Sequence, residues 1–155
     1  MPAIPRPTVR VVLLDDADRL LLFRSDSPRR WYLPGGGLRP DETYETAAQR
    51  ELFEETGLAE VEIGPEVWRG RPWVADWEGV SYQVHQRYHL ARLPAFDIST
   101  SRFEAFERSQ ITGHKWWTLR ELTLTPDLLR PANLPALITD LLHQGPPEIP
   151  TSVDG

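Results

Sequence analysis

Apolar and polar positions alternate along the chain with the periods of both strands and helices. Short apolar runs cover residues 9–14 and 20–23, and the acidic segment 15–19 between them predicts the turn of a β-hairpin. Alternation over residues 80–92 predicts a longer strand, and shorter strands are expected at 31–33 and 115–117. We expect the aspartates of the turn to be solvated, because the twelve-residue pattern of a calcium loop is absent.

Three segments carry helix signals. The first helix is expected from an N-cap at Thr43 to about Thr56, where Gly57 offers a left-handed cap. Residues 118–121 (TLRE) fit a capping box at the start of a second helix. A third helix is predicted by an apolar stripe at helical spacing, which Gly145 ends. The stripe comprises Leu134, Leu137, Ile138, Leu141 and Leu142. Because strands and helices interleave, the expected fold class is a mixed α/β layer fold.

Length and composition narrow the class of protein. A chain of 155 residues predicts a single domain over residues 1–155. Prolines gather in residues 2–7 and 146–150, so we expect an ordered core of about 8–145 with both proline-rich tails outside it. The absence of cysteine excludes a disulfide scaffold and any cysteine-ligated zinc or iron–sulfur site.

Charge and hydropathy restrict the partners. A net charge of -6 argues against a nucleic-acid partner, and no apolar run approaches the roughly 20 residues of a membrane-spanning helix. The N-terminus lacks the charged-then-apolar order of a signal peptide. We therefore expect a cytoplasmic globular domain with no nucleic-acid and no membrane partner.

Residues 34–58 (PGGGLRPDETYETAAQRELFEETGL) carry the candidate chemistry. Because a helix turns about 100° per residue, Glu51, Glu54 and Glu55 share one face of its last turn, where the helix dipole is negative. Two carboxylates about 6 Å apart repel by roughly 3 kcal/mol at an effective dielectric near 20. Arg50 relieves only part of this repulsion. The cluster is either a solvated acidic face or a cation site.

The glycines ahead of the helix favour the cation site. A glycine-rich turn at residues 34–37 can bring bare backbone close to a ligand. Hard oxygen donors suit Mg²⁺, or Mn²⁺ as a substitute, and such ions commonly bridge to phosphate oxygens. The expected ligand is therefore a metal-bound polyphosphate.

The same segment resembles the Nudix box. Gly36, Glu42 and the run Arg50–Leu58 (RELFEETGL) match the box at its specified positions, and residues 114–122 resemble the tryptophan-bearing strand and following helix of many bacterial Nudix hydrolases. The resemblance to the Nudix (MutT-like) family implies a Nudix-type α/β/α sandwich with a mixed β-sheet. It also implies Mg²⁺-dependent hydrolysis of a nucleoside diphosphate linked to another group X.

Site residues follow from this resemblance. It implies that Glu51, Glu54 and Glu55 bind the divalent metal, with the backbone carbonyl of Gly35 as a further ligand. Arg50 is expected to orient the acids through a salt bridge. The expected mechanism is attack by water on phosphorus, with the metal lowering the pKa of that water.

The general base is open between a box glutamate and an acid in a later loop. Glu104 and Glu107 lie in such a loop, and Glu107 is preferred because related chains often carry a glutamate there, although an ordinary surface charge is an equal alternative. Glu42 is expected to support the geometry of the loop and helix. The candidate catalytic residues are therefore Glu51, Glu54, Arg50 and Glu107.

The substrate is not specified further. Trp68, Trp73 and Trp77 could stack on a nucleobase or fill the core, and His85 and His89 are expected to be ordinary sheet histidines instead of zinc ligands.

Nucleoside triphosphates, nucleotide sugars and dinucleotides all fit the box. The alternative function is a catalytically silent Nudix domain that senses a nucleotide. Family members often dimerise, so a homodimer is compatible with the resemblance.

Overall fold

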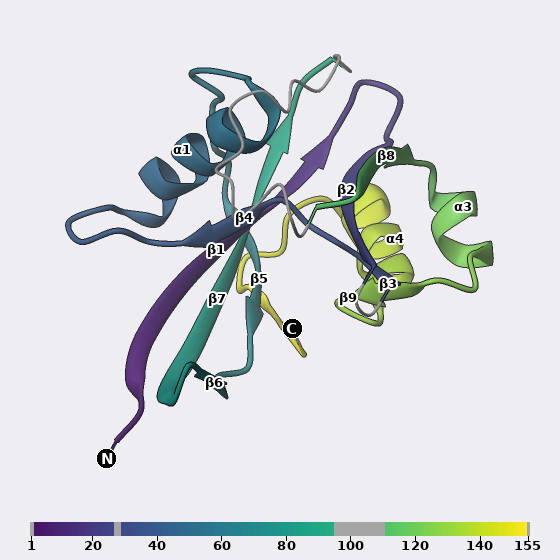
Figure 1. Ribbon diagram of the computed structural model, residues 1–155. Helices are drawn as coiled ribbons and strands as arrows, with labels where there is room; N and C mark the ends of the chain where they lie inside the picture. Colours follow the sequence, from purple (N-terminus) through teal and green to yellow (C-terminus); the bar gives the residue numbers. More distant parts are fainter. Residues whose placement is uncertain (1, 27–28, 95–110, 155) are drawn as a thin grey trace.

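A curled mixed β-sheet with helices on both faces forms the protein (Figure 1). The computed structural model describes residues 2–26, 29–94 and 111–154. The helices are α1 (Tyr44–Thr56), α3 (Leu119–Leu124) and α4 (Leu134–Gln144). The strands are β1 (Ile4–Leu14), β2 (Leu20–Asp26), β3 (Arg29–Tyr32), β4 (Gly35–Gly37), β5 (Glu66–Gly70), β6 (Trp73–Trp77), β7 (Val80–Arg92), β8 (Gly113–Trp117), β9 (Leu128–Arg130) and β10 (Thr151–Val153). No helix within these described ranges is long and apolar enough to cross a membrane.

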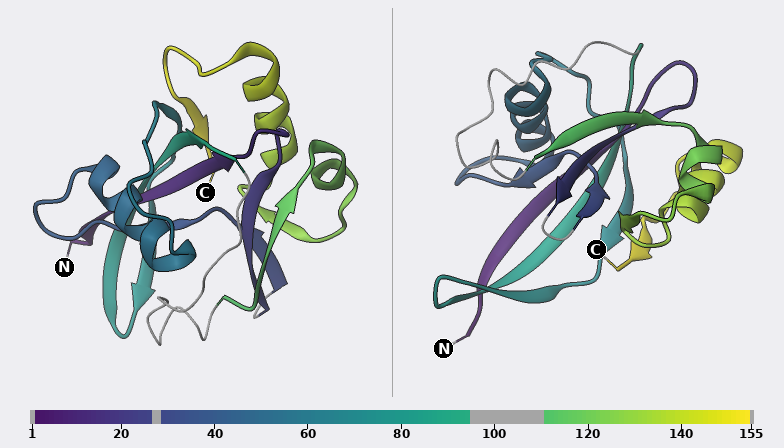
Figure 2. Two further views of the ribbon diagram at one scale, coloured as in Figure 1. Left: turned by 90° about the horizontal axis from the view of Figure 1, so that it is seen from above. Right: turned by 45° about the vertical axis from the view of Figure 1, so that its right-hand side comes forward.

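The two longest strands form the centre of the sheet. β1 and β7 pair in parallel from Ile4↔Tyr82 to Leu14↔Arg92, within the strand order β10-β5-β7-β1-β2-β3-β9. β4 pairs with β1, β6 with β7 and β8 with β2, all antiparallel. The outer ends of β1 and β7, together with β6, extend beyond the rest of the sheet (Figure 2). We call this extension, residues 4–8 and 73–84, the β-wing.

Side chains of β1 alternate between two cores, because successive residues of a strand point to opposite faces. Val9, Val11 and Leu13 pack with α1 on one face of the sheet. Val12 and Leu14 pack with α4 and Trp117 on the other. This two-sided arrangement confirms the predicted α/β class.

Local sequence signals located the helices well. α1 begins after the N-cap Thr43, whose side chain accepts from the backbone of Thr46, and it ends at Gly57 with a φ of 81°. The predicted capping box of α3 is present between Thr118 and Glu121. α4 ends at Gly145, as predicted. The hairpin and the long strand at Val80–Arg92 are also confirmed.

The expected boundaries of the core were wrong at both ends. β1 already begins at Ile4, and β10 pairs in parallel with β5 and buries Val153. Pro5 and Pro7 have no backbone N–H to donate to a neighbouring strand. β1 tolerates them because β4 pairs with β1 only as far as Thr8, so β4 requires no N–H from either proline.

Two turn predictions were also wrong. Residues 35–37 form the short strand β4, paired with β1, instead of a turn. Asp15 is fully buried instead of solvated. Its carboxylate accepts the backbone N–H groups of Ala17 and Arg19 and pairs with the Arg19 guanidinium at 2.7 Å, so the turn supplies the hydrogen bonds that water was expected to supply.

Candidate active site

The box glutamates lie in the second half of α1, which packs over β4. Glu51 and Glu55 are four residues apart and both are buried, whereas the side chain of Glu54 is 18% exposed. No basic residue lies in the last turn of the helix. The negative end of the helix dipole therefore adds to the repulsion among these acids, and their stabilisation must come from residues outside this last turn.

Arg50 provides much of that stabilisation. Its Nε and Nη2 donate to the two carboxylate oxygens of Glu42 at 2.8 and 2.9 Å. Nη1 donates to Glu51 at 3.0 Å and to Glu54 at 3.3 Å, and Nη2 also donates to the carbonyl of Gly37 at 3.0 Å. The side-chain hydrogen bond from Arg50 lowers the pKa of Glu42, and the same bond raises the pKa of Arg50. One guanidinium thus ties the helix to the segment that precedes it.

β4 brings bare backbone against the acids. The N–H of Gly35 donates to Glu55 at 2.9 Å, and the carbonyl of Gly35 accepts from Arg10 Nη1 at 3.3 Å. A Cβ on Gly36 would lie 2.7 Å from the carboxyl carbon of Glu51. Only glycine therefore allows the strand to pass this close to the Glu51 carboxylate.

This contact gives a testable expectation for Gly36→Ala. The added methyl group would displace the buried Glu51 carboxylate, so the free energy of unfolding should fall by about 1–3 kcal/mol. Gly113→Ala is the matched control, since its added Cβ would meet nothing closer than 3.5 Å. Urea denaturation of both variants measures the difference. Equal stability of the two variants would contradict the close contact at Gly36.

Sequence spacing did not reveal the other arginines of the site. Arg39 Nη2 lies 3.2 Å from Glu54, and Arg10 reaches the Gly35 carbonyl from β1. Both contacts depend on the pairing of distant segments, so no local signal could have identified them. Within the part of the chain that the structure describes, no group of three acidic or histidine side chains converges as a ready metal site.

The tryptophan and histidine candidates from the sequence lie in other parts of the molecule than α1 and β4. Trp68 is buried in the core, whereas Trp73 and Trp77 are each 43% exposed on the β-wing. His89 is buried and its Nδ1 lies 3.0 Å from the carbonyl of Gly64. Glu104 and Glu107 lie outside the described residues.

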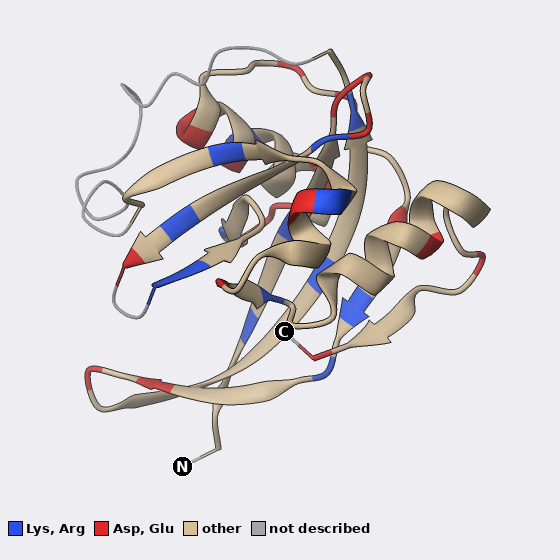
Figure 3. Cartoon of the chain, turned by 90° about the vertical axis from the view of Figure 1, so that its right-hand side faces the viewer, with Lys and Arg blue, Asp and Glu red and all other residues tan. Residues whose placement is uncertain are grey.

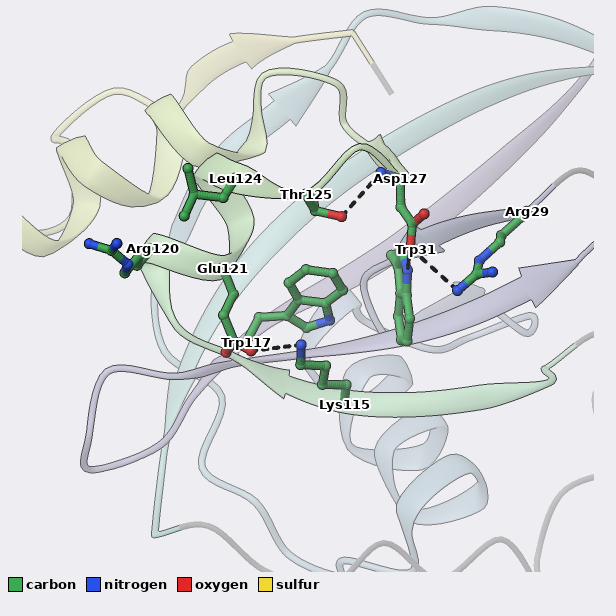
Figure 4. Close-up of a pocket in the computed structure, with 9 residues that line it drawn as sticks. All are labelled: Arg29, Trp31, Lys115, Trp117, Arg120, Glu121, Leu124, Thr125 and Asp127. Carbon is green, nitrogen blue, oxygen red and sulfur yellow. Dashed lines mark hydrogen bonds and ion pairs between the residues drawn. The ribbon is translucent and has the colours of Figure 1, made fainter.

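A separate cavity of about 430 Å³ lies on the opposite side of the sheet, between β3, β8 and α3 (Figure 4). Trp31 and Trp117 meet edge to face there, with ring centroids 5.0 Å apart. Lys115 pairs with Glu121 at 2.7 Å, and Trp31 Nε1 donates to Asp127 at 2.9 Å. The α1 glutamates do not line this cavity, so we place the candidate active site at α1 and β4.

Basic and acidic residues are interspersed along the strands, helices and connecting loops (Figure 3). Of the 17 basic residues, Lys115 is the single lysine. Ion pairs around α1 are therefore made by arginine, whose planar fork binds carboxylates and phosphates with two donors at once.

Comparison with known proteins identifies the family. A model described as NUDIX domain matches residues 4–138. An RNA pyrophosphohydrolase of Pseudomonas fluorescens (strain SBW25) is 43% identical over 58 residues, which cover 37% of this chain and 36% of that protein. The chain thus aligns with about a third of the length of the curated relatives it matches.

Solved structures share the fold. A MutT protein from Methanosarcina mazei Go1 superposes with a TM-score of 0.68 at 18% identity, covering 93% of this chain and 97% of that one. An ADP-ribose pyrophosphatase from Streptococcus suis 89-1591 gives 0.63 at 21% identity, covering 96% and 97%. Since the family model spans most of its residues, the chain belongs to the Nudix family.

Proposed function

We propose that this protein is a Mg²⁺-dependent pyrophosphohydrolase that cleaves the diphosphate of a small nucleoside diphosphate derivative. The observation that carries the proposal is the complete acidic box on α1, held against the glycine backbone of β4. Three carboxylates at the negative end of a helix are costly for folding alone, and a divalent cation offsets that cost.

The donor set fits such a cation. Glu51, Glu54 and Glu55 offer carboxylate oxygens and Gly35 offers a carbonyl, which are the hard donors that Mg²⁺ and Mn²⁺ prefer. The missing Cβ of Gly36 keeps the backbone close to the Glu51 carboxylate. When bound, the metal would lower the pKa of the attacking water and neutralise charge on the phosphate oxygens.

Residues of the chain would position the metal ligands, accept the proton of the attacking water and attract the anionic substrate. Arg50 positions Glu51 and Glu54 through its two Nη1 contacts. A box glutamate or Glu107 would accept the proton of the attacking water. With a net charge of -6, the protein as a whole repels anionic substrates, so local cations must provide the attraction.

A substrate panel with and without metal tests the proposal. It should contain nucleoside triphosphates, nucleotide sugars, dinucleotides and, because the curated relatives are named RNA pyrophosphohydrolases, a short RNA with a 5′ triphosphate. We expect phosphate or nucleotide release from at least one compound with millimolar Mg²⁺ and none with EDTA. Millimolar Mg²⁺ should also raise the melting temperature, because the ion binds the native acids.

Three outcomes would distinguish the possibilities. Metal-dependent turnover supports the proposal. A rise in melting temperature without turnover of any compound would instead identify a silent nucleotide-sensing domain. Turnover that persists in EDTA would contradict the metal site.

A further inference from the structure

Arg6 lies over two aromatic rings of the β-wing. Its guanidinium carbon is 4.9 Å from the ring centroid of Trp77 and 5.9 Å from that of Tyr82. The strand register places these side chains on one face of the sheet. Stacking uses the flat face of the guanidinium, which leaves its edge N–H groups available as donors. Among the residues that the structure describes, no carboxylate pairs with Arg6.

Gly37 connects this stack to the candidate active site. A Cβ on Gly37 would lie 3.2 Å from Arg6 Nη2, so the guanidinium rests against the bare backbone of this glycine. The carbonyl of the same glycine accepts from Arg50 Nη2 at 3.0 Å. Arg6 has the parity of Val12 and Leu14 in β1, so it lies on the face of the sheet opposite α1. The backbone of Gly37 in β4 therefore separates Arg6, on that face, from the arginine that orients the box glutamates on the other.

We propose that Arg6 and Trp77 form a nucleotide subsite beside this active site, which a substrate reaches around the edge of β4, with the nucleobase on the Trp77 ring and a phosphate oxygen on the Arg6 guanidinium. The inference rests on the proposed function and specifies which part of the chain recognises its substrate. Tyr82 and Arg6 already pack on the Trp77 ring, at 5.2 and 4.9 Å from its centroid, and Trp77 is still 43% exposed, so a base would stack on the part of the ring that these two leave uncovered. The guanidinium edge matches the geometry of a phosphate.

Charge favours a nucleotide over another partner at this position. The protein is acidic overall, so Arg6, which has no acidic partner among the described residues and lies beside β4, supplies the local attraction that a diphosphate needs. An aromatic ring next to that cation suits the other half of the same molecule, the base. A second copy of the chain that covered the neighbouring apolar residues Ile4 and Val80, on the same face of the β-wing, would also have to bury the Arg6 guanidinium.

Steady-state kinetics of four single variants test the subsite. Arg6→Ala and Trp77→Ala should each raise KM about tenfold on the best substrate of the panel, with kcat nearly unchanged. Trp73→Ala is the matched aromatic control, because Trp73 is equally exposed, at 43%, on the same strand. Arg71→Ala is the matched cationic control, since Arg71 is exposed and lies near Asp154 in the C-terminal segment. Both controls should keep the KM of the unmodified protein.

A binding measurement separates this inference from the proposed function. Calorimetric titration of ADP with Mg²⁺ should show a Kd about tenfold higher for Arg6→Ala and Trp77→Ala than for the controls. If the unmodified protein turns over no substrate, the proposed function fails, and the ADP titration still decides the subsite. Unchanged KM and Kd in both variants would overturn the subsite, as would an equal loss in Trp73→Ala. Loss of a dimer in Trp77→Ala, with ADP binding intact, would assign the β-wing to self-association and also overturn it.

Discussion

Glu54→Gln should reduce kcat by about a hundredfold or more while the protein remains folded. The change removes a negative charge where the proposed metal and the phosphate meet, and losses of this size are typical when one electrostatic group of a preorganised site is removed. Glu54 is the most exposed of the three acids, with an 18% exposed side chain, and glutamine keeps its size. Initial rates at saturating substrate and Mg²⁺ measure the loss.

Two further glutamine variants test whether the loss of kcat is specific to the box glutamates. Glu55→Gln should be similarly inactive, although its amide oxygen can still accept the N–H of Gly35, so β4 should remain in place. Glu45→Gln is the matched control, because Glu45 lies in the first turn of the same helix, away from the box. Its kcat should stay within about threefold of the unmodified value, since it removes no charge from the site. Turnover that survives both Glu54→Gln and Glu55→Gln would place the catalytic site elsewhere.

Features encoded by neighbouring residues could be predicted from sequence. Thr43 and Gly57 bound α1 because a hydroxyl satisfies the first amides and a glycine adopts the left-handed cap at little cost. Thr118 and Glu121 start α3 for a similar reason. The placement of the box glutamates on one helix follows from these boundaries, so the acidic half of the site was predictable.

Features that depend on distant pairing were missed. β10 exists only because residues 151–153 find the edge of β5, and no periodicity in three residues could indicate it. Residues 35–37 read as a turn because glycines favour turns, yet their register with β1 makes them a strand. Arg10 and Arg39 join the site through tertiary contacts, so their roles follow from the fold and not from spacing along the chain.

Arg50→Met should destabilise the protein more than any other single change at the site, by roughly 3 kcal/mol at neutral pH. The variant leaves the carboxylates of Glu42, Glu51 and Glu54 without their shared guanidinium. Arg50 lowers the pKa of Glu42 in the folded state from its ordinary value of 4.5. That stabilisation is therefore complete above pH 4.5 and is lost as the pH falls through the lowered pKa. Urea denaturation at pH 7 and in acid should show the gap between the two proteins narrowing as the pH falls.

Further measurements show whether the loss of stability in Arg50→Met comes from its ion pairs with Glu42, Glu51 and Glu54. Arg39→Met removes an exposed arginine that also contacts Glu54, and it should cost less than about 1 kcal/mol because water screens that pair. Combining Arg50→Met with Glu42→Gln should cost less than the sum of the single changes, because the second change removes one of the uncompensated charges. Millimolar Mg²⁺ should restore part of the stability of Arg50→Met, since a divalent ion replaces the lost positive charge among the same acids. Strict additivity of the two changes, with no stabilisation by Mg²⁺, would show that Arg50 acts through packing alone and that the acids do not form a cation site.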